Sequence, residues 1–219
     1  MGLLYLLHRA LGMLSPSWGF FPYAFVAQPV PTKPLLPAAL AQQGRSERLC
    51  PGSPWLEGAD FPTALAAERF ARGDEGVAAL RKGHCVGYAW WANKSYLERE
   101  VNCLFEWGNE PAAVFDFDVF VKPEHRMGLG FMAVWDGLLQ ELRSAGIQCS
   151  FSRISRFNLS SMRAHERLGA QPIGTVSFLR VGRLLLALSG RPLSFRFARV
   201  DGKPLRLQLS AEGLRWLYE

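Results

Sequence analysis

The chain has 219 residues, of which 49% are hydrophobic, and its formal net charge is +6. This composition excludes an intrinsically disordered chain, because there is ample apolar material for a core. The length fits one elaborated domain better than two full domains. The basic residues are spread along the chain rather than gathered in one block, which disfavours a basic tail that wraps a nucleic acid.

The cysteines and the apolar segments bear on the cellular compartment. No two cysteines form a CxxC pair and none has a histidine at ligand spacing, so we expect no structural zinc site and no other metal. His8 and Arg9 interrupt the apolar start of the chain and no small-residue cleavage site follows, so we expect no signal peptide. No run reaches the roughly 18 uninterrupted apolar residues of a membrane span. These features predict a cytoplasmic protein with reduced thiols.

The first sixty residues contain short elements. Apolar side chains at helical spacing predict a helix over 3–14, which Pro16 ends. The aromatic segment 20–30 is typical of an extended strand, and a second short helix is predicted over 35–43. Residues 44–60 are rich in Gly, Ser, Pro and charge, and they are predicted to form a loop.

A regular pattern begins at residue 62. A helix is predicted over 62–72, followed by strands over 76–81 and 84–93 and an extended stretch over 96–106. Segment 113–121 is the clearest strand, because its side chains alternate strictly. One face would carry Phe115, Phe117, Val119 and Val121, and the other Asp116, Asp118 and Phe120.

The C-terminal half alternates helices and strands. An amphipathic helix over 129–145 ends at Gly146, a strand covers 148–155, and a helix over 158–168 has Asn158 as its N-cap. Two strands around 174–188 and a hairpin over 193–209, turning at Asp201 and Gly202, complete the chain. The order of elements predicts an α/β (α+β) fold, in which a mixed central β-sheet is flanked by helices.

The turn between the strand 113–121 and the helix that follows it could bind a phosphate. Free backbone N–H groups at a helix N-terminus favour negative charge, and glycines allow a phosphate to come close. His125 and Arg126 stand beside this helix N-terminus. The alternative is a tight strand-to-helix turn whose basic side chains are merely solvated.

A second motif supports the phosphate-binding interpretation. Residues 158–170, Asn-Leu-Ser-Ser-Met-Arg-Ala-His-Glu-Arg-Leu-Gly-Ala, follow the next strand at the distance that completes a β-α-β-α unit. With both motifs, residues 75–185 resemble the GCN5-related N-acetyltransferase (GNAT) superfamily. In that family a V-x-P-x-x-(Q/R)-x-x-G-x-(G/A) segment at a strand end binds the pyrophosphate of acetyl-CoA. An N-x-x-(A/S)-x-x-x-(Y/F)-E-(K/R)-x-G-(F/A) helix then flanks the pantetheine and the thiol.

The resemblance implies a set of residues that bind acetyl-CoA. With Gly128 and Gly130 as the two motif glycines, His125 takes the position where Gln or Arg is usual, and the loop is one residue short relative to Pro123. Either His125 or Arg126 would then contact the phosphates. The implied cofactor-binding residues are Val119, Val121, His125, Arg126, Met127, Gly128, Leu129, Gly130, Asn158 and Ser161.

The resemblance also implies direct transfer of an acetyl group from acetyl-CoA to an amine. A backbone N–H from residues 119–121 would bind the thioester carbonyl. Asp116 and Asp118, expected on one face of the strand, could each act as general base, with Asp118 nearer the strand end, or both could be solvated or paired with an arginine. His165, where many members of the family carry a Tyr, could protonate the departing thiolate, or it could simply pack in the helix. Three further carboxylates are candidates for the base, namely Glu98, Glu100 and Glu106.

The expected domain organisation has a core with a flanking segment at each end. We expect an N-terminal extension over 1–60, an acetyltransferase core over 61–190, and a C-terminal hairpin and tail over 191–219 within the same domain. The flanks would shape the acceptor site or form an oligomer contact, such as that of a homodimer. The expected partner is a small-molecule amine or a peptide amine, and not a nucleic acid. The alternative function is a non-catalytic GNAT-fold scaffold, which uses its aromatic N-terminal segment to contact a protein or a membrane surface.

Overall fold

The protein is described by a computed structural model that covers residues 2–37, 44–57, 61–108, 112–126, 129–190 and 193–217. The chain forms two compact units. Unit 1 comprises Met1–Gln28, Lys94–Glu110 and Phe151–Glu219, and unit 2 comprises Pro29–Asn93 and Pro111–Ser150. Each unit is therefore assembled from segments that are distant in sequence.

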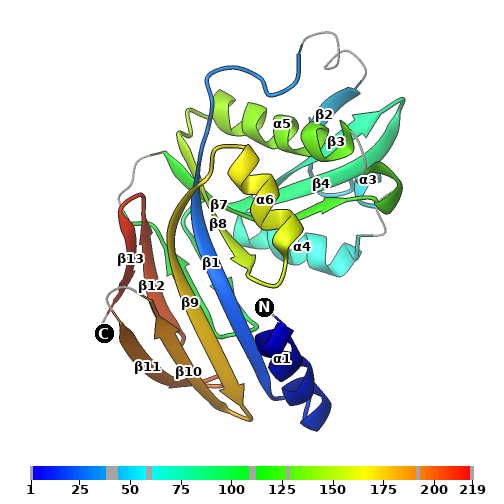
Figure 1. Ribbon diagram of the computed structural model, residues 1–219. Coiled ribbons are helices and arrows are strands. Elements are labelled where there is room, and N and C mark those ends of the chain that lie inside the picture. The colour runs from blue at the N-terminus through cyan, green and yellow to red at the C-terminus, as the bar shows by residue number, and fades with distance from the viewer. Residues whose placement is uncertain are drawn as a thin grey trace. The chain divides into compact units, whose positions relative to one another are not determined.

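Unit 2 is built on antiparallel strands in the order β7-β4-β3-β2 (Figure 1). The strands are β2 (Gly44–Arg48), β3 (Glu75–Arg81), β4 (His84–Ala92) and β7 (Ala113–Val121). Lys82 and Gly83 join β3 to β4 with positive φ values of 50° and 79°. A two-residue turn of this kind matches the twist of the strands that it connects.

Two helices cover the two faces of these strands. Helix α5 (Leu129–Ser144) lies against β2, β3 and β4, and a Cβ added at Gly87 of β4 would come 2.7 Å from Val134 of this helix. Helix α4 (Thr63–Arg72) lies on the other face, where the ring centroids of Phe70 and Trp90 are 5.2 Å apart. Two short helices, α3 (Pro54–Glu57) and the 3-10 helix η1 (Pro123–His125), complete the described part of unit 2.

Unit 1 contains two groups of strands. The first has the order β11-β10-β9-β1-β8, with β8 contributing its residues 151–155, and the second is the mixed sheet β13-β12-β6-β5 (Figure 1). In the second sheet β12 runs parallel to β6, whereas the other neighbours are antiparallel. The strands are β1 (Gly19–Pro29), β5 (Ser95–Glu98), β6 (Cys103–Glu106), β8 (Cys149–Ser155), β9 (Gln171–Val181), β10 (Leu184–Ser189), β11 (Ser194–Arg199), β12 (Leu205–Ser210) and β13 (Gly213–Trp216).

Aromatic side chains join the two groups of strands in unit 1. The ring of Phe25 in β1 meets that of Phe105 in β6 edge to face at 5.1 Å, and Phe178 of β9 meets Trp216 of β13 at 6.5 Å. The adjacent β1 residue, Ala24, faces the other way and lines a cavity beside helix α6 (Leu159–Arg167). Helix α1 (Gly2–Leu14) is tied to the start of β1 through a hydrogen bond between its His8 and the carbonyl of Phe20.

Most of the elements predicted from local patterns are confirmed. The helices predicted over 3–14, 62–72, 129–145 and 158–168 and the strand over 113–121 all occur, with ends that differ by two residues at most.

Two other predictions are wrong, and a third falls mainly outside the described residues. The loop predicted over 44–60 is wrong, since β2 and α3 lie in it. The helix predicted over 35–43 falls mainly outside the described residues, and 35–37 are not helical. The hairpin predicted over 193–209 is also wrong, because β11 pairs with β10 whereas β12 pairs with β6 and β13.

Rings of the aromatic N-terminal segment are buried within strand β1. In β1, Tyr23 is 2% exposed and Phe25 is fully buried, and the strand pairs along its length with β9. These rings are therefore core residues of unit 1 and are not available for the surface contact that the alternative function requires. None of the helices in the described ranges combines the length and the apolar run that crossing a bilayer needs.

Candidate functional site

Strand β7 contains a β-bulge in the middle of its regular sequence. Its Phe117 is paired with Trp90 and its Phe120 with Tyr88, so two β7 residues, Asp118 and Val119, stand opposite a single residue of β4. Asp118 has a φ of 49°, in the left-handed region that residues other than glycine rarely adopt. An extra residue in one strand is the defining feature of a bulge, and it disrupts the local ladder.

The bulge reverses the alternation of side chains along β7. Trp90 and Tyr88 are two residues apart and share a face, so their partners Phe117 and Phe120 also share that face. The stacking of Phe120 on Tyr88, with centroids 5.2 Å apart, agrees with this assignment. The predicted division of β7 into two faces is therefore wrong beyond Phe117, because a bulge shifts the register by one residue.

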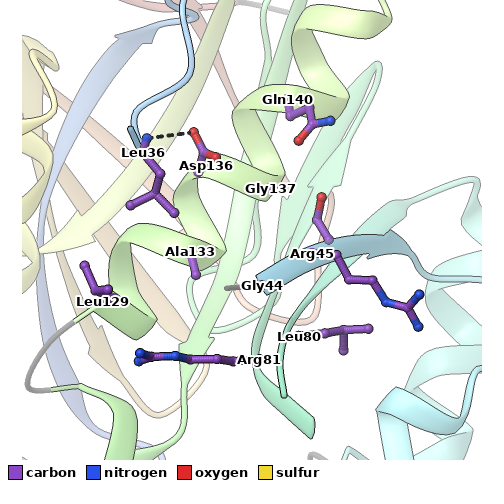
Figure 2. Close-up of a pocket in the computed structure, with 11 residues that line it drawn as sticks. Leu36, Gly44, Arg45, Leu80, Arg81, Leu129, Ala133, Asp136, Gly137 and Gln140 are labelled. Atoms are coloured by element: carbon purple, nitrogen blue, oxygen red, sulfur yellow. Dashed lines mark hydrogen bonds between the residues drawn. The ribbon is translucent and has the colours of Figure 1, made fainter. Parts of the chain in front are cut away.

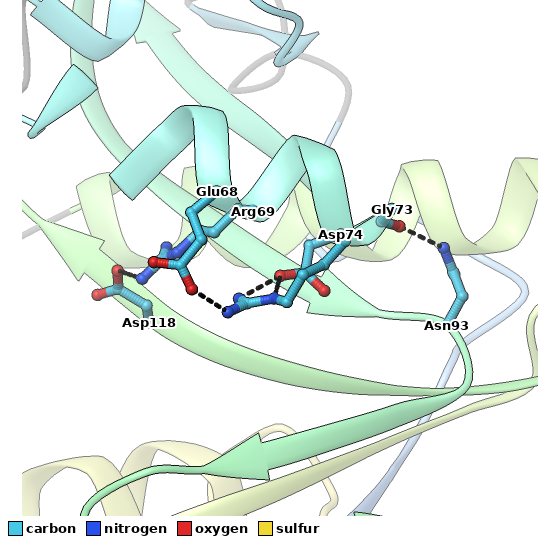
Figure 3. Close-up of polar contacts among 7 residues, drawn as sticks. Glu68, Arg69, Gly73, Asp74, Asn93 and Asp118 are labelled. Carbon is cyan, nitrogen blue, oxygen red and sulfur yellow. Dashed lines mark hydrogen bonds and ion pairs between the residues drawn. The ribbon is translucent and has the colours of Figure 1, made fainter. Parts of the chain in front are cut away.

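Asp116 and Asp118 consequently have different surroundings. The buried carboxylate of Asp116 accepts a hydrogen bond of 2.5 Å from the hydroxyl of Ser150. The side chain of Asp118 is 36% exposed, and its Oδ2 lies 2.7 Å from Nη2 of Arg69 in helix α4 (Figure 3). Of the two alternatives for Asp118, pairing with an arginine is therefore the arrangement observed.

The turn after β7 has the strand-turn-helix form that the sequence predicted. Helix η1 begins with Pro123, and the Nε of Arg126 donates a 2.9 Å hydrogen bond to the carbonyl of Val121. A Cβ added at Gly130 would come 2.4 Å from the carbonyl oxygen of His125, so only glycine permits this close approach of the turn to α5. Met127 and Gly128 lie outside the described residues.

The second motif forms the start of helix α6 in unit 1. The Oδ1 of Asn158 accepts hydrogen bonds from the backbone N–H of Ser161 at 3.0 Å and from the hydroxyl of Ser160 at 2.8 Å. Asn158 is therefore the N-cap of α6, as predicted. His165, 6% exposed, lines a cavity of about 360 Å³ whose wall is mainly apolar.

The candidate site residues divide between the two units. Those of the first motif belong to unit 2 and those of the second motif to unit 1. The unit 2 residues that the structure describes are Asp118, Val119, Val121, His125, Arg126, Leu129 and Gly130, and the unit 1 residues are Asn158, Ser161 and His165.

Unit 2 has a second, smaller cavity of about 80 Å³, between α5 and the ends of β2 and β3 (Figure 2). Beside it the buried carboxylate of Asp136 accepts hydrogen bonds from the backbone N–H groups of Leu35 at 2.6 Å and Leu36 at 3.3 Å. The Nε of Arg143 donates a hydrogen bond of 2.7 Å to the carbonyl of Pro31. These contacts attach the segment after β1 to α5, which gives Asp136 a structural role.

A partly buried polar cluster in unit 1 accounts for two of the other candidate carboxylates. The hydroxyl of Tyr23 donates a hydrogen bond to Glu100, and the guanidinium of Arg153 pairs with Glu98. The third candidate, Glu106, receives two hydrogen bonds, of 2.8 Å and 2.9 Å, from Arg206.

Sequence reasoning did not single out Arg69, Asp136 or Arg153. A lone charged residue in an amphipathic helix or strand is usually solvated, so their sequence positions carry no signal. Within the described ranges, no group of three or more His, Cys, Asp or Glu side chains is placed to hold a metal ion.

Comparison with known proteins relates the chain to others through structure alone. No protein-family model matches the sequence, and no curated protein matches it. A GNAT-family protein from Novosphingobium aromaticivorans is similar with a TM-score of 0.50 and 13% identity over 72% of this chain. A tandem GNAT protein from the clavulanic acid biosynthesis pathway has a TM-score of 0.51 and 13% identity over 89% of it.

A third similar structure is a GCN5-related glucosamine N-acetyltransferase region of a fungal multi-domain β-N-acetylglucosaminidase, with a TM-score of 0.52 and 14% identity over 79% of this chain. The chain spans 62% of the first of these structures, 59% of the second and 22% of the third. At these identities the likeness concerns the fold. The chain has the GNAT fold, and the predicted fold class, a mixed β-sheet with flanking helices, is confirmed.

Proposed function

We propose that the protein transfers an acetyl group from acetyl-CoA to an amine. The GNAT fold supports this reaction class, and the observation that carries the proposal is the turn after β7. There the close approach of Gly130 to His125 brings the basic turn against the N-terminus of α5. Such a helix end offers free backbone N–H groups and a favourable dipole to a pyrophosphate.

The residues of unit 2 would bind the donor. His125 and Arg126 carry the side chains that meet its phosphates, with the N–H groups of the first turn of α5. The backbone of Val119–Val121, which begins in the bulge, would donate to the thioester carbonyl as that oxygen becomes negatively charged. Bound acetyl-CoA supplies the activated acetyl group, and the amine attacks its carbonyl carbon.

The reaction also needs a proton for the leaving thiolate and an acceptor for the proton of the ammonium. His165 would protonate the leaving thiolate, since an imidazole can donate a proton near neutral pH. The two aspartates of β7 are poorly suited to take the proton of the acceptor ammonium, so that proton would pass to water before the neutral amine attacks. Asp116 is buried and hydrogen-bonded to Ser150, and the charge of Asp118 is balanced by Arg69.

Calorimetric titration with acetyl-CoA and with CoA tests the proposal. We expect saturable binding of both, and about tenfold weaker binding by Arg126→Ala, because one phosphate contact is lost. Arg215→Ala, which removes an exposed arginine from β13, is the matched control and should bind like the wild type. Absence of binding by the wild-type protein would contradict the proposal.

Turnover should then be measured by mass spectrometry of the products with a panel of amines. The panel should contain an amino sugar, a lysine peptide and a small aliphatic amine, because the acceptor is proposed only as an amine. His165→Phe should lower kcat most at high pH, where a replacement proton for the thiolate is scarce. An unchanged kcat across the pH range would remove the acid role of His165.

A further inference from the structure

Arg69 is an arginine buried among aromatic rings in unit 2. It is 7% exposed, and its guanidinium carbon lies 4.8 Å from the ring centroid of Phe61 and 5.0 Å from those of Trp90 and Phe117. Aromatic faces attract a cation, but they offset only part of the cost of removing a guanidinium from water. A group in this position therefore needs an anionic partner.

Asp118 is that partner. Its Oδ2 lies 2.7 Å from Nη2 of Arg69, whereas Nη1 has no hydrogen-bond partner among the residues that the structure describes (Figure 3). A flexible lysine could not replace this arginine, because only a planar guanidinium can lie against several rings and also meet a carboxylate. The ion pair joins helix α4 directly to the bulge of β7.

The backbone of Asp118 requires such support. A φ of 49° is unfavourable for any residue with a Cβ, and it persists only where the surroundings hold it. The Phe117 side chain is held beside the same guanidinium, so Arg69 contacts two consecutive residues of β7 at the bulge. Loss of the guanidinium would free the bulge to return to a regular ladder, which would rotate the backbone of the residues that follow.

We propose that Arg69 is a positioning residue that holds the β7 bulge through Asp118, and that Asp118 serves as its charge partner and not as the general base. The inference rests on the proposed function, in which the backbone of Val119–Val121, which begins in the bulge, meets the thioester carbonyl. Arg69 thus acts on the transition state from outside the reacting groups, by fixing the direction of a backbone N–H.

The first test is Arg69→Met, which keeps an apolar chain among the rings and removes the charge. We expect kcat to fall by about 10- to 100-fold, which is less than for outright loss of an oxyanion donor because the backbone N–H is misdirected and not removed. The KM for acetyl-CoA should change less than about threefold, because the phosphate-binding turn is untouched. Arg45→Met, at a side chain that is 69% exposed in the same unit, is the matched control and should leave kcat unchanged.

The second test is the double variant Arg69→Met with Asp118→Gly. Glycine adopts positive φ without a steric penalty, and no charge remains unpaired, so this variant should recover kcat to within about fivefold of the wild type. The acid limb of its pH profile should also be unchanged, since no catalytic carboxylate has been removed. Thermal melting monitors the folding of each variant.

The outcomes separate this inference from the proposed function. A wild-type protein without acetyl-CoA binding overturns the proposed function. If the wild type is active, an unaffected Arg69→Met variant overturns the role of Arg69. A double variant less active than Arg69→Met alone, or one that has lost the acid limb, identifies Asp118 as a base and overturns the role assigned to it here.

Discussion

The guanidinium carbon of Arg153 lies 4.3 Å from the ring centroid of Tyr23 in unit 1. The arginine also pairs with Glu98, and the Tyr23 hydroxyl donates to Glu100. Burial raises the pKa of Tyr23 above its ordinary value; the positive charge of Arg153 lowers it in part, and the two carboxylates raise it further. Burial and the two carboxylates thus keep this tyrosine protonated, against the opposing effect of the cation on its ring face.

This raised pKa predicts how stability depends on pH. Above about pH 10 the unfolded chain loses the Tyr23 proton whereas the folded chain retains it, so the free energy of unfolding falls as pH rises. The fall should approach about 1.4 kcal/mol per pH unit for each such tyrosine. Tyr23→Phe should therefore show a shallower decline between about pH 10 and 11.5 in denaturant titrations. Tyr5→Phe, at an exposed ring, is the control and should follow the wild-type curve. Equal slopes for Tyr23→Phe and the wild type would contradict the prediction.

Arg153 should contribute far more to stability than another paired arginine in unit 1. Arg153→Met would leave the Glu98 carboxylate, whose side chain is 8% exposed, without its cation, and we expect a loss of about 3–5 kcal/mol. Arg206→Met breaks the pair with Glu106, in which the two side chains are 41% and 23% exposed, so its cost should stay below about 1 kcal/mol. Urea unfolding of the two variants gives the comparison. Similar costs would mean that burial does not govern these pairs.

Gly130 should be essential for the turn that is proposed to bind phosphates. Gly130→Ala would place a methyl group 2.4 Å from the His125 carbonyl, so η1 or α5 must move. We expect a lower melting temperature and at least tenfold weaker binding of CoA, measured by calorimetry. Gly12→Ala makes the same substitution in α1, where nothing lies within 4 Å, and should raise stability by up to about 1 kcal/mol. A Gly130→Ala variant with wild-type CoA affinity would show that the close approach is dispensable.

The cysteines should differ sharply in reactivity. Cys50 is exposed, whereas burial raises the pKa values of the Cys85 and Cys103 thiols and shields both from solvent. Because the thiolate is the reactive form, iodoacetamide at pH 8 should label Cys50 first. Mass spectrometry of timed digests measures this order, and early labelling of Cys103 in folded protein would contradict it. Activity assays that detect free CoA with a thiol reagent should use Cys50→Ser protein.

Local sequence patterns were sufficient to predict those elements whose position and ends depend on their own residues. The helix that begins at Leu129 was recognised from its apolar spacing and ends before Gly146, whose φ is 74°. The cap of α6 by Asn158 followed from residue type alone. The strand Ala113–Val121 was found with its exact ends. In each case periodicity and end residues are properties of the segment itself.

The pairing of strands that are distant in the sequence was not predicted. The strand β11 was expected to turn back on its successor, but it pairs with β10, and the Asp201 turn leads into a different sheet. Choice of a partner depends on which apolar faces meet in three dimensions, and a turn residue does not determine it. The bulge of β7 was missed for the same reason, because its register is set by β4.

For the positively charged residues, too, the sequence determined one part of the outcome and the tertiary structure another. The sequence determined that the chain is basic, that it has enough apolar residues for a core, and that a glycine-bearing turn follows its clearest strand. Only the tertiary structure decided what individual charges do. It buries Arg69 among three rings and pairs it with Asp118, and it places Arg153 against the ring of Tyr23. The reason is physical: a charge acquires its role from its partners and its distance from water, and residues far apart in the sequence supply both.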